Sequence, residues 1–303
     1  MLRRRYIVAV ALLIVVLNFL FAACTSSASN GSQSTLGTPG AYTCVRGNIT
    51  ASGSTALAPL VQAVAEKYQA KCSGSTITVN LGGSKTGLAN AEEGASTIGN
   101  SDLFADKKTQ ADLFDHQVAV VPFAVIINPQ VGVKSLTTTQ LKKIYSGQAT
   151  NWKQIGGPDM QIAVVTRPTT SGTRATFQQY VLGGAETIPV GNLSSDTTGT
   201  VIQDVAQNPG AIGYAATFPA QKSGDVVVAA IDGHASTKDL VKDNTYHFWN
   251  IEHMYTRGTA KNLAQALIDY MASPDGKAAI ASLGFISISD IDPATLQTRQ
   301  PAH

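Results

Sequence analysis

The chain has 303 residues, of which 44% are hydrophobic and 14% are charged, and its formal net charge at pH 7 is +2. This composition is typical of a folded globular protein with room for two domains, and it excludes an intrinsically disordered chain. Part of the positive charge comes from Arg3, Arg4 and Arg5, which lie in a segment that we expect to be removed. A broad nucleic-acid-binding surface is therefore excluded, and any anion site must be local.

The first residues have the pattern of an export signal. Arginines at positions 3–5 precede an apolar run over residues 6–21, and Ala22, Ala23 and Cys24 follow. A basic segment, an apolar core and small residues before the cleavage point predict a signal peptide over residues 1–23. The position of Cys24 is similar to that in bacterial lipoprotein signals, which implies that Cys24 is acylated and becomes the first mature residue. An uncleaved membrane anchor and a twin-arginine signal are the alternatives.

The segment after the signal is rich in Ser, Thr, Gly and Asn and offers almost nothing to bury. We therefore expect residues 24–43 to be a lipidated flexible tether. Beyond this tether two cysteines remain, Cys44 and Cys72. In an oxidising compartment such a pair is expected to form a structural disulfide, with two separate thiols as the alternative.

Three polar turns, each between a predicted strand and a predicted helix, are the main functional signal. The strands are expected at residues 48–51, 76–81 and 162–165, and the helices at 56–70, 88–93 and 175–181. The turns carry more hydroxyls than capping requires, namely Ser52, Ser54, Thr55, Ser84, Thr86, Ser171 and Thr173. Because the first N–H groups of a helix lack intrahelical partners, these turns and the guanidinium of Arg167 predict an anion-binding site. Ordinary helix capping is the alternative.

Asp102 follows a short apolar strand expected at residues 96–99 and is the one carboxylate placed directly at such a strand end. A carboxylate only repels a fully deprotonated oxyanion. It can, however, accept the P–OH hydrogen of monohydrogen phosphate, a hydrogen bond that sulfate cannot offer at neutral pH. Asp102 therefore favours a protonated anion, with a solvated surface residue or a helix cap as the alternative.

The rest of the chain alternates strands with helices, as is typical of α/β layers. An apolar run over residues 117–128 contains Pro122 and is long for one strand, so we expect it to pass from one lobe into another. A second run, over residues 226–231, is expected to return the chain to the first lobe. Helices are also expected at residues 137–145, 201–207, 263–271 and 276–282, a strand at 211–215, and loops at 147–159 and 191–199.

Signals for catalysis or metal binding are weak. The histidines lie far in sequence from the three turns, and the sequence contains no HExxH or paired-carboxylate motif. His247, Glu252 and His253 lie around Phe248 and Trp249, where we expect a loop or an interface patch rather than a metal site. We therefore expect no catalytic residue, no metal and no cofactor.

The ordered motifs resemble the phosphate-binding lipoproteins of bacterial high-affinity phosphate ABC transporters over roughly residues 46–290. The motifs are Gly-Ser-Thr-Ala-Leu, Gly-Gly-Ser, Gly-Asn-Ser-Asp, Lys-Lys-Ile-Tyr-Ser-Gly-Gln-Ala-Thr-Asn-Trp, Ser-Gly-Thr-Arg-Ala-Thr-Phe and Gly-Ala-Ile-Gly-Tyr. The resemblance implies a two-lobed, type II periplasmic-binding-protein-like α/β fold, in which each lobe is a mixed sheet flanked by helices and the ligand cleft lies between the lobes. Lobe I would comprise residues 44–124 plus 226–299, and lobe II residues 125–225.

The same resemblance implies a function and a set of ligand contacts. The implied phosphate-binding residues are Ser54, Thr55, Ser84, Asp102, Arg167, Ser171, Gly172 and Thr173. The implied partners are inorganic phosphate and the permease subunits of an ABC transporter, with no nucleic acid and a monomeric state. The protein is expected to be exported and held by its lipid on the outer face of the cytoplasmic membrane.

Two positions depart from the family pattern, since Lys85 and Thr170 stand where Gly is usual. Losing a Gly narrows the backbone conformations of a turn, and Lys85 would add a cation near the anion. The alternatives are therefore a binding protein for sulfate, molybdate or tungstate, a phosphate-ester hydrolase with Ser54 or Ser171 as nucleophile, and a surface adhesin or sensor.

Overall fold

The structure, a computed structural model of the chain, describes residues 42–187 and 193–301. The predicted signal peptide, Cys24 and nearly all of the predicted tether lie outside the described residues, as does part of the loop expected at 191–199. Among the described residues, no helix has both the length and the apolar character needed to cross a membrane.

The described residues form helices and strands that alternate along much of the chain. The strands are β1 (Gly47–Gly53), β2 (Ser75–Leu81), β3 (Ile98–Ser101), β4 (Leu113–Ile127), β5 (Ser135–Leu136), β6 (Ala163–Thr166), β7 (Leu193–Ser194), β8 (Ala211–Ala216), β9 (Val227–Ile231) and β10 (Trp249–Arg257). The α-helices are α2 (Ala58–Lys71), α3 (Ser84–Glu93), α4 (Thr138–Tyr145), α5 (Gly172–Phe177), α6 (Thr198–Gln207), α7 (Thr217–Ser223), α8 (Lys238–Lys242), α9 (Asn262–Met271), α10 (Pro274–Ser282) and α11 (Pro293–Gln297). A π-helix, Gln178–Leu182, continues α5, and short 3₁₀ helices occur at Pro129–Val131, Trp152–Ile155 and Ile288–Asp290.

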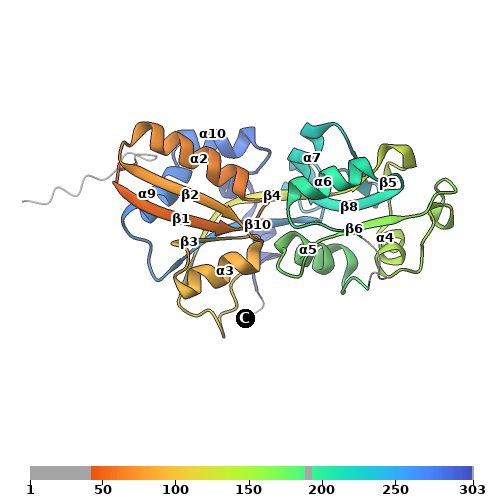
Figure 1. Cartoon of the computed structure of the whole chain (residues 1–303), viewed down its shortest axis with the longest axis horizontal. Helices are drawn as coiled ribbons and strands as arrows, with labels where there is room; N and C mark the ends of the chain where they lie inside the picture. Colours follow the sequence, from red (N-terminus) through yellow and green to blue (C-terminus); the bar gives the residue numbers. More distant parts are fainter. Residues whose placement is uncertain (1–41, 188–192, 302–303) are drawn as a thin grey trace, which may run out of the picture. The chain divides into compact units, whose positions relative to one another are not determined.

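Strand β4 connects two sheets. Its first part, up to Pro122, pairs antiparallel with β10, whereas Phe123 and the following residues pair with β8, and Val125 to Ile127 also pair with β9. The path of strands is β2-β1-β3-β10-β4-β8-β6-β7, and β5 joins through β9. Figure 1 shows β1–β3 with α2, α3, α9 and α10 on one side of β4, and β5, β6 and β8 with α4–α7 on the other. The long run with an internal Pro122 thus passes from one sheet to the next, as expected.

Strand β9 differs from the sequence prediction. The run at 226–231 was expected to return the chain to the first sheet, but β9 pairs with the same part of β4 as β8 does, with Val125 opposite Ala229. The chain returns to the first sheet through β10, a strand that we did not predict from the sequence. The residue limits of the two lobes stay a prediction, and β9 lies on the lobe II side of β4.

Helix α2 packs its apolar face on the first sheet. Its buried residues are Ala58, Leu60, Val61, Val64, Ala65 and Tyr68, a stripe at three- and four-residue spacing that packs on the sheet. A disulfide joins Cys44, just before β1, to Cys72 at the end of this helix. The first strand and the first helix are therefore held together by packing and by a covalent link.

Candidate functional site

The carboxyl ends of the first three strands bring the predicted turns together. Strands β2 and β3 both pair parallel with β1, so all three end at one edge of the sheet. The Ser54 hydroxyl, after β1, donates a hydrogen bond to the carboxylate of Asp102, after β3. The Asp102 amide donates to Oγ of Ser84, at the start of α3, over 2.9 Å. All three residues are buried, so they form a polar cluster shielded from solvent.

The turn between β6 and α5 completes this cluster from the second sheet. Thr173 donates its hydroxyl hydrogen to the second oxygen of Asp102, with Oγ1 and Oδ2 3.1 Å apart. Gly172 lies so close that a Cβ atom there would be 2.2 Å from Ser84 Oγ and 2.9 Å from Asp102 Cβ. The absence of a side chain at position 172 is therefore what allows the two sides to meet.

Arg167 supplies the positive charge of the cluster. Its Nη2 donates to Thr55 Oγ1 and to the Asp196 carbonyl, each over 2.9 Å, and the residue is 1% exposed. Its Nε and Nη1 have no hydrogen-bond partner among the described residues. Burial lowers the pKa of Arg167 and the nearby charge of Asp102 raises it, but a guanidinium stays protonated in proteins. A buried cation thus retains free donors near the Asp102 carboxylate.

Ser171 has a capping role. Its hydroxyl accepts a hydrogen bond from the Arg174 amide over 3.2 Å, as an N-cap residue does for a helix such as α5. The capping alternative therefore holds for Ser171 and in part for Ser54, whose hydroxyl accepts from the Ala56 and Leu57 amides and also donates to Asp102. The hydroxyl of Thr173 donates to Asp102. All eight predicted residues lie in one connected group, and their role as ligand contacts stays a prediction.

A second polar network, not foreseen from the sequence, supports the Arg167 turn from behind. Arg174 donates to the Arg167 carbonyl and forms an ion pair with Glu186, with Nε and Oε2 3.2 Å apart. Thr166 and Tyr214 each donate to the Glu186 carboxylate over 2.6 Å. Burial raises the pKa of Glu186, and these hydrogen bonds and the charge of Arg174 oppose that shift. Glu186 lies 20 residues from Thr166 in sequence, so no local motif marks it.

The two unusual residues, Lys85 and Thr170, meet at the edge of the cluster. The Lys85 amide donates to the Thr170 carbonyl over 3.1 Å, which links the start of α3 to the turn before α5. A Cβ atom on Gly83 would lie 2.8 Å from the same carbonyl, so the backbones approach closely here. Lys85 itself is exposed. Lys85 and Thr170, the two departures from the family pattern, therefore lie where the start of α3 contacts the turn before α5. Neither belongs to the buried donors of the cluster.

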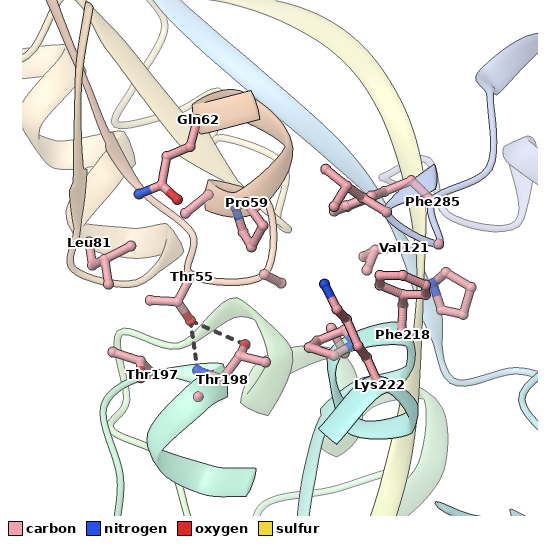
Figure 2. A pocket seen from close by; sticks show the side chains of 18 residues that line it. Thr55, Pro59, Gln62, Leu81, Val121, Thr197, Thr198, Phe218, Lys222 and Phe285 are labelled. Carbon is pink, nitrogen blue, oxygen red and sulfur yellow. Dashed lines mark hydrogen bonds between the residues drawn. The ribbon is translucent and has the colours of Figure 1, made fainter. Parts of the chain in front are cut away.

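An apolar cavity of about 370 Å³ lies next to the cluster (Figure 2). Thr55 lies at its wall, where its Oγ1 is 3.3 Å from the Thr198 amide nitrogen and 3.4 Å from the Thr198 hydroxyl. Pro59, Val121, Phe218 and Phe285 provide apolar wall (Figure 2). Its lining shares Thr55 with the polar cluster but includes neither Asp102 nor Arg167.

Of the three residues for which we expected a loop or an interface patch, His247 lies in an exposed loop, whereas Glu252 and His253 lie in a buried strand. Glu252 and His253 are both 0% exposed and belong to β10. His253 Nδ1 lies 2.7 Å from a carboxylate oxygen of Asp115. Among the described residues, no group of three or more His, Cys, Asp or Glu side chains is arranged to hold a metal ion.

Strand β10 also supplies Asn250, whose side-chain amide donates to the Asp102 carbonyl over 2.7 Å. Nothing in the sequence indicated this contact.

Comparisons with known proteins agree with this geometry. Residues 29–275 match the PBP superfamily domain. The phosphate-binding protein PstS of Bacillus subtilis is 44% identical over 249 residues, which cover 81% of this chain and 82% of that protein. The chain belongs to the PBP superfamily.

Solved structures of related proteins have a similar fold. A substrate-binding protein from Clostridium perfringens, assigned to phosphate ABC transport and crystallised with bound phosphate, is 32% identical with a TM-score of 0.75, and the match covers 80% of this chain and 100% of that one. An ABC-type phosphate transport receptor from Vibrio cholerae is 28% identical with a TM-score of 0.65, at the same coverage. The fold of this chain is therefore the two-lobed α/β fold that the sequence predicted.

Proposed function

We propose that this protein is an extracytoplasmic solute-binding protein that captures inorganic phosphate and delivers it to an ABC permease. The observation that carries the proposal is the pairing of one buried guanidinium, Arg167, which retains free donors, with one buried carboxylate, Asp102, in a cluster of hydroxyls. The relatives described above bind phosphate by name or contain it in their crystals.

The chemistry of the cluster suits monohydrogen phosphate. Its three unprotonated oxygens need donors, which the free N–H groups of Arg167 and the amides at the start of α5 would provide, while the hydroxyls of Ser54 and Thr173 donate to Asp102. Its P–OH group needs an acceptor, and a carboxylate has lone pairs left after accepting two hydroxyls. Sulfate at neutral pH has no hydrogen to give, so Asp102 would face it as an uncompensated negative charge. We therefore propose that Asp102 selects phosphate over sulfate.

Binding and release would follow the separation and closure of the two lobes around β4, a hinge motion found in many two-lobed binding proteins. The contacts Thr173 to Asp102 and Thr55 to Arg167 join residues from the two sides. No covalent step is required. We propose that the protein has no catalytic activity, and sustained release of product from a chromogenic phosphomonoester, with or without divalent metals, would contradict this part of the proposal.

Calorimetric titration of residues 40–303 with phosphate, sulfate and molybdate at two pH values tests the function. Phosphate should bind most tightly, and Asp102→Asn should weaken phosphate binding by about tenfold or more, because it removes a charged acceptor. Asp225→Asn is the matched control, since it removes the same charge at an exposed residue outside the cluster. Equal affinities of the wild type for phosphate and sulfate would refute the assignment.

The cellular arrangement of the protein is also a proposal. We infer that Cys24 carries the lipid anchor, that the protein acts as a monomer, and that it stands on the outer face of the cytoplasmic membrane. The predicted signal peptide over residues 1–23 supports the extracytoplasmic location. Metabolic labelling with a fatty acid tests the anchor, because a Cys24→Ala variant should lose the label while keeping phosphate affinity.

A further inference from the structure

The buried carboxyl of Glu252 lies behind Asp102. Strands β3 and β10 are antiparallel, with Ser101 opposite His253 and Asn100 opposite Met254. Continued by one residue, this register places Asp102 opposite Glu252, on the same face of the sheet, where Cβ atoms of facing residues are about 4.5–5.5 Å apart. Asn250, two residues earlier on the same face of β10, already bonds the Asp102 carbonyl. Strand β10, which lies between β3 and β4 in the sheet, therefore borders the cluster at Asp102.

On the two neighbouring strands, no cation faces Glu252. The residue is 0% exposed, and apart from Asp102, whose carboxylate interacts with it, neither of its carboxyl oxygens has a hydrogen-bond partner among the described residues. From β4 it faces Ala119, and from β3 it faces Asp102 and the neutral, buried amide of Asn100. The buried cation of the cluster, Arg167, donates to Thr55 and to the Asp196 carbonyl.

These surroundings favour the protonated form of Glu252 over the ionised form. An isolated carboxylate in such a place is strongly unfavourable, so the group neutralises instead. Burial first, and then the negative charge of Asp102, raise the pKa of Glu252 well above its usual value. A protonated carboxyl has an O–H donor, and the ionised oxygens of Asp102 are the acceptors beside it. A hydrogen bond to an ionised carboxylate favours the ionised form.

We propose that Glu252 is a positioning residue that determines anion specificity: as a neutral acid it donates a hydrogen bond to Asp102 and keeps Asp102 in its ionised, acceptor-only state. This inference rests on the proposed phosphate-binding function. Without the donor, Asp102 takes up a proton more easily, and a protonated Asp102 can donate to sulfate. Glu252 thus acts through Asp102 on the choice between a protonated and a proton-free anion.

The test compares the full-length wild type with Glu252→Gln and Glu252→Leu by calorimetric titration with inorganic phosphate and sulfate between about pH 5 and pH 8. The amide of the Gln variant still donates, so its ratio of phosphate to sulfate affinity should stay near that of the wild type. The Leu variant lacks a donor, and its ratio should fall by about tenfold or more at the acid end. An unchanged ratio in a folded Leu variant, or an equal fall in the Gln variant, overturns the proposal.

A spectroscopic readout covers the case in which the Leu variant does not fold. At neutral pH the wild type should show the infrared carbonyl band of a buried protonated carboxylic acid, and this band should be missing from Glu252→Gln. If the wild type lacks the band, Glu252 is ionised and the inference fails. Failure of the underlying function looks different, because the wild type itself would then not bind phosphate.

Discussion

The substitution Gly172→Ala tests whether closure of the cleft is needed for binding. A Cβ atom there would be 2.2 Å from Ser84 Oγ, 2.8 Å from Ser84 Cβ and 2.9 Å from Asp102 Cβ, whereas real Cβ atoms essentially never come closer than 3.0 Å. Rotation of the Ser84 hydroxyl does not remove the two carbon contacts. The turn before α5 must therefore move away from the ends of β2 and β3.

The size of the effect follows from the cost of such overpacking, which is typically about 1–3 kcal/mol. The two contacting sides belong to different sheets, so the free protein relieves the overlap by separating them, and the cost falls on the closed, ligand-bound form. We expect the Kd for phosphate to rise by about 5- to 150-fold. The unfolding temperature without phosphate should change little, because Ala is a better helix residue than Gly in the first turn of α5.

Thermal unfolding with increasing phosphate, together with calorimetry, measures both quantities, since a ligand of the native state raises Tm according to its Kd. The control is Gly199→Ala, in the first turn of α6, where a Cβ atom would meet only Thr197 Oγ1 at 3.8 Å. The control should bind phosphate like the wild type. If Gly172→Ala also binds like the wild type, the close approach of these two turns is not part of the bound state.

Three further changes test the packing and the charges around the site. Replacing Cys44 and Cys72 by Ser should lower the unfolding free energy by about 2–5 kcal/mol in urea titrations, without changing the Kd for phosphate, because the link lies outside the cluster. Trp152→Phe should cost about 1–3 kcal/mol by the same assay, since it removes the 2.9 Å bond from the indole N–H to the Gly210 carbonyl. Folding raises the pKa of Glu252. The stability that its protonated form contributes is therefore fully present below the pKa of an unfolded Glu, about 4.3, and this contribution is lost as pH rises through the folded pKa. Glu252→Gln should therefore gain stability relative to the wild type between about pH 5 and pH 8, and a constant difference would contradict the shift.

Much of the fold follows from local patterns in the sequence. The stripe of α2 and the long run of β4 with Pro122 were readable, because each buries apolar side chains at a regular period. The sequence also predicted an anion-binding site at the three turns, since they contain more hydroxyl residues and Gly than helix capping requires. Three helix starts were predicted too late: the helices expected from residues 88, 175 and 201 begin at Ser84, Gly172 and Thr198. The hydroxyls of the second turn therefore belong to the first turn of α3 itself.

Strand β10 was missed for a physical reason that bears on function. Periodicity methods look for apolar side chains on the buried face, yet β10 buries Asn250, Glu252 and His253. Each of these polar residues would be costly there without a specific environment, and Asn250 is bonded directly to the Asp102 carbonyl. Proteins break local sequence–structure rules mainly at functional sites, where a polar residue is needed in a buried position. The failure of the hydrophobic pattern along β10 therefore points to the same place as the geometry, namely the wall behind Asp102.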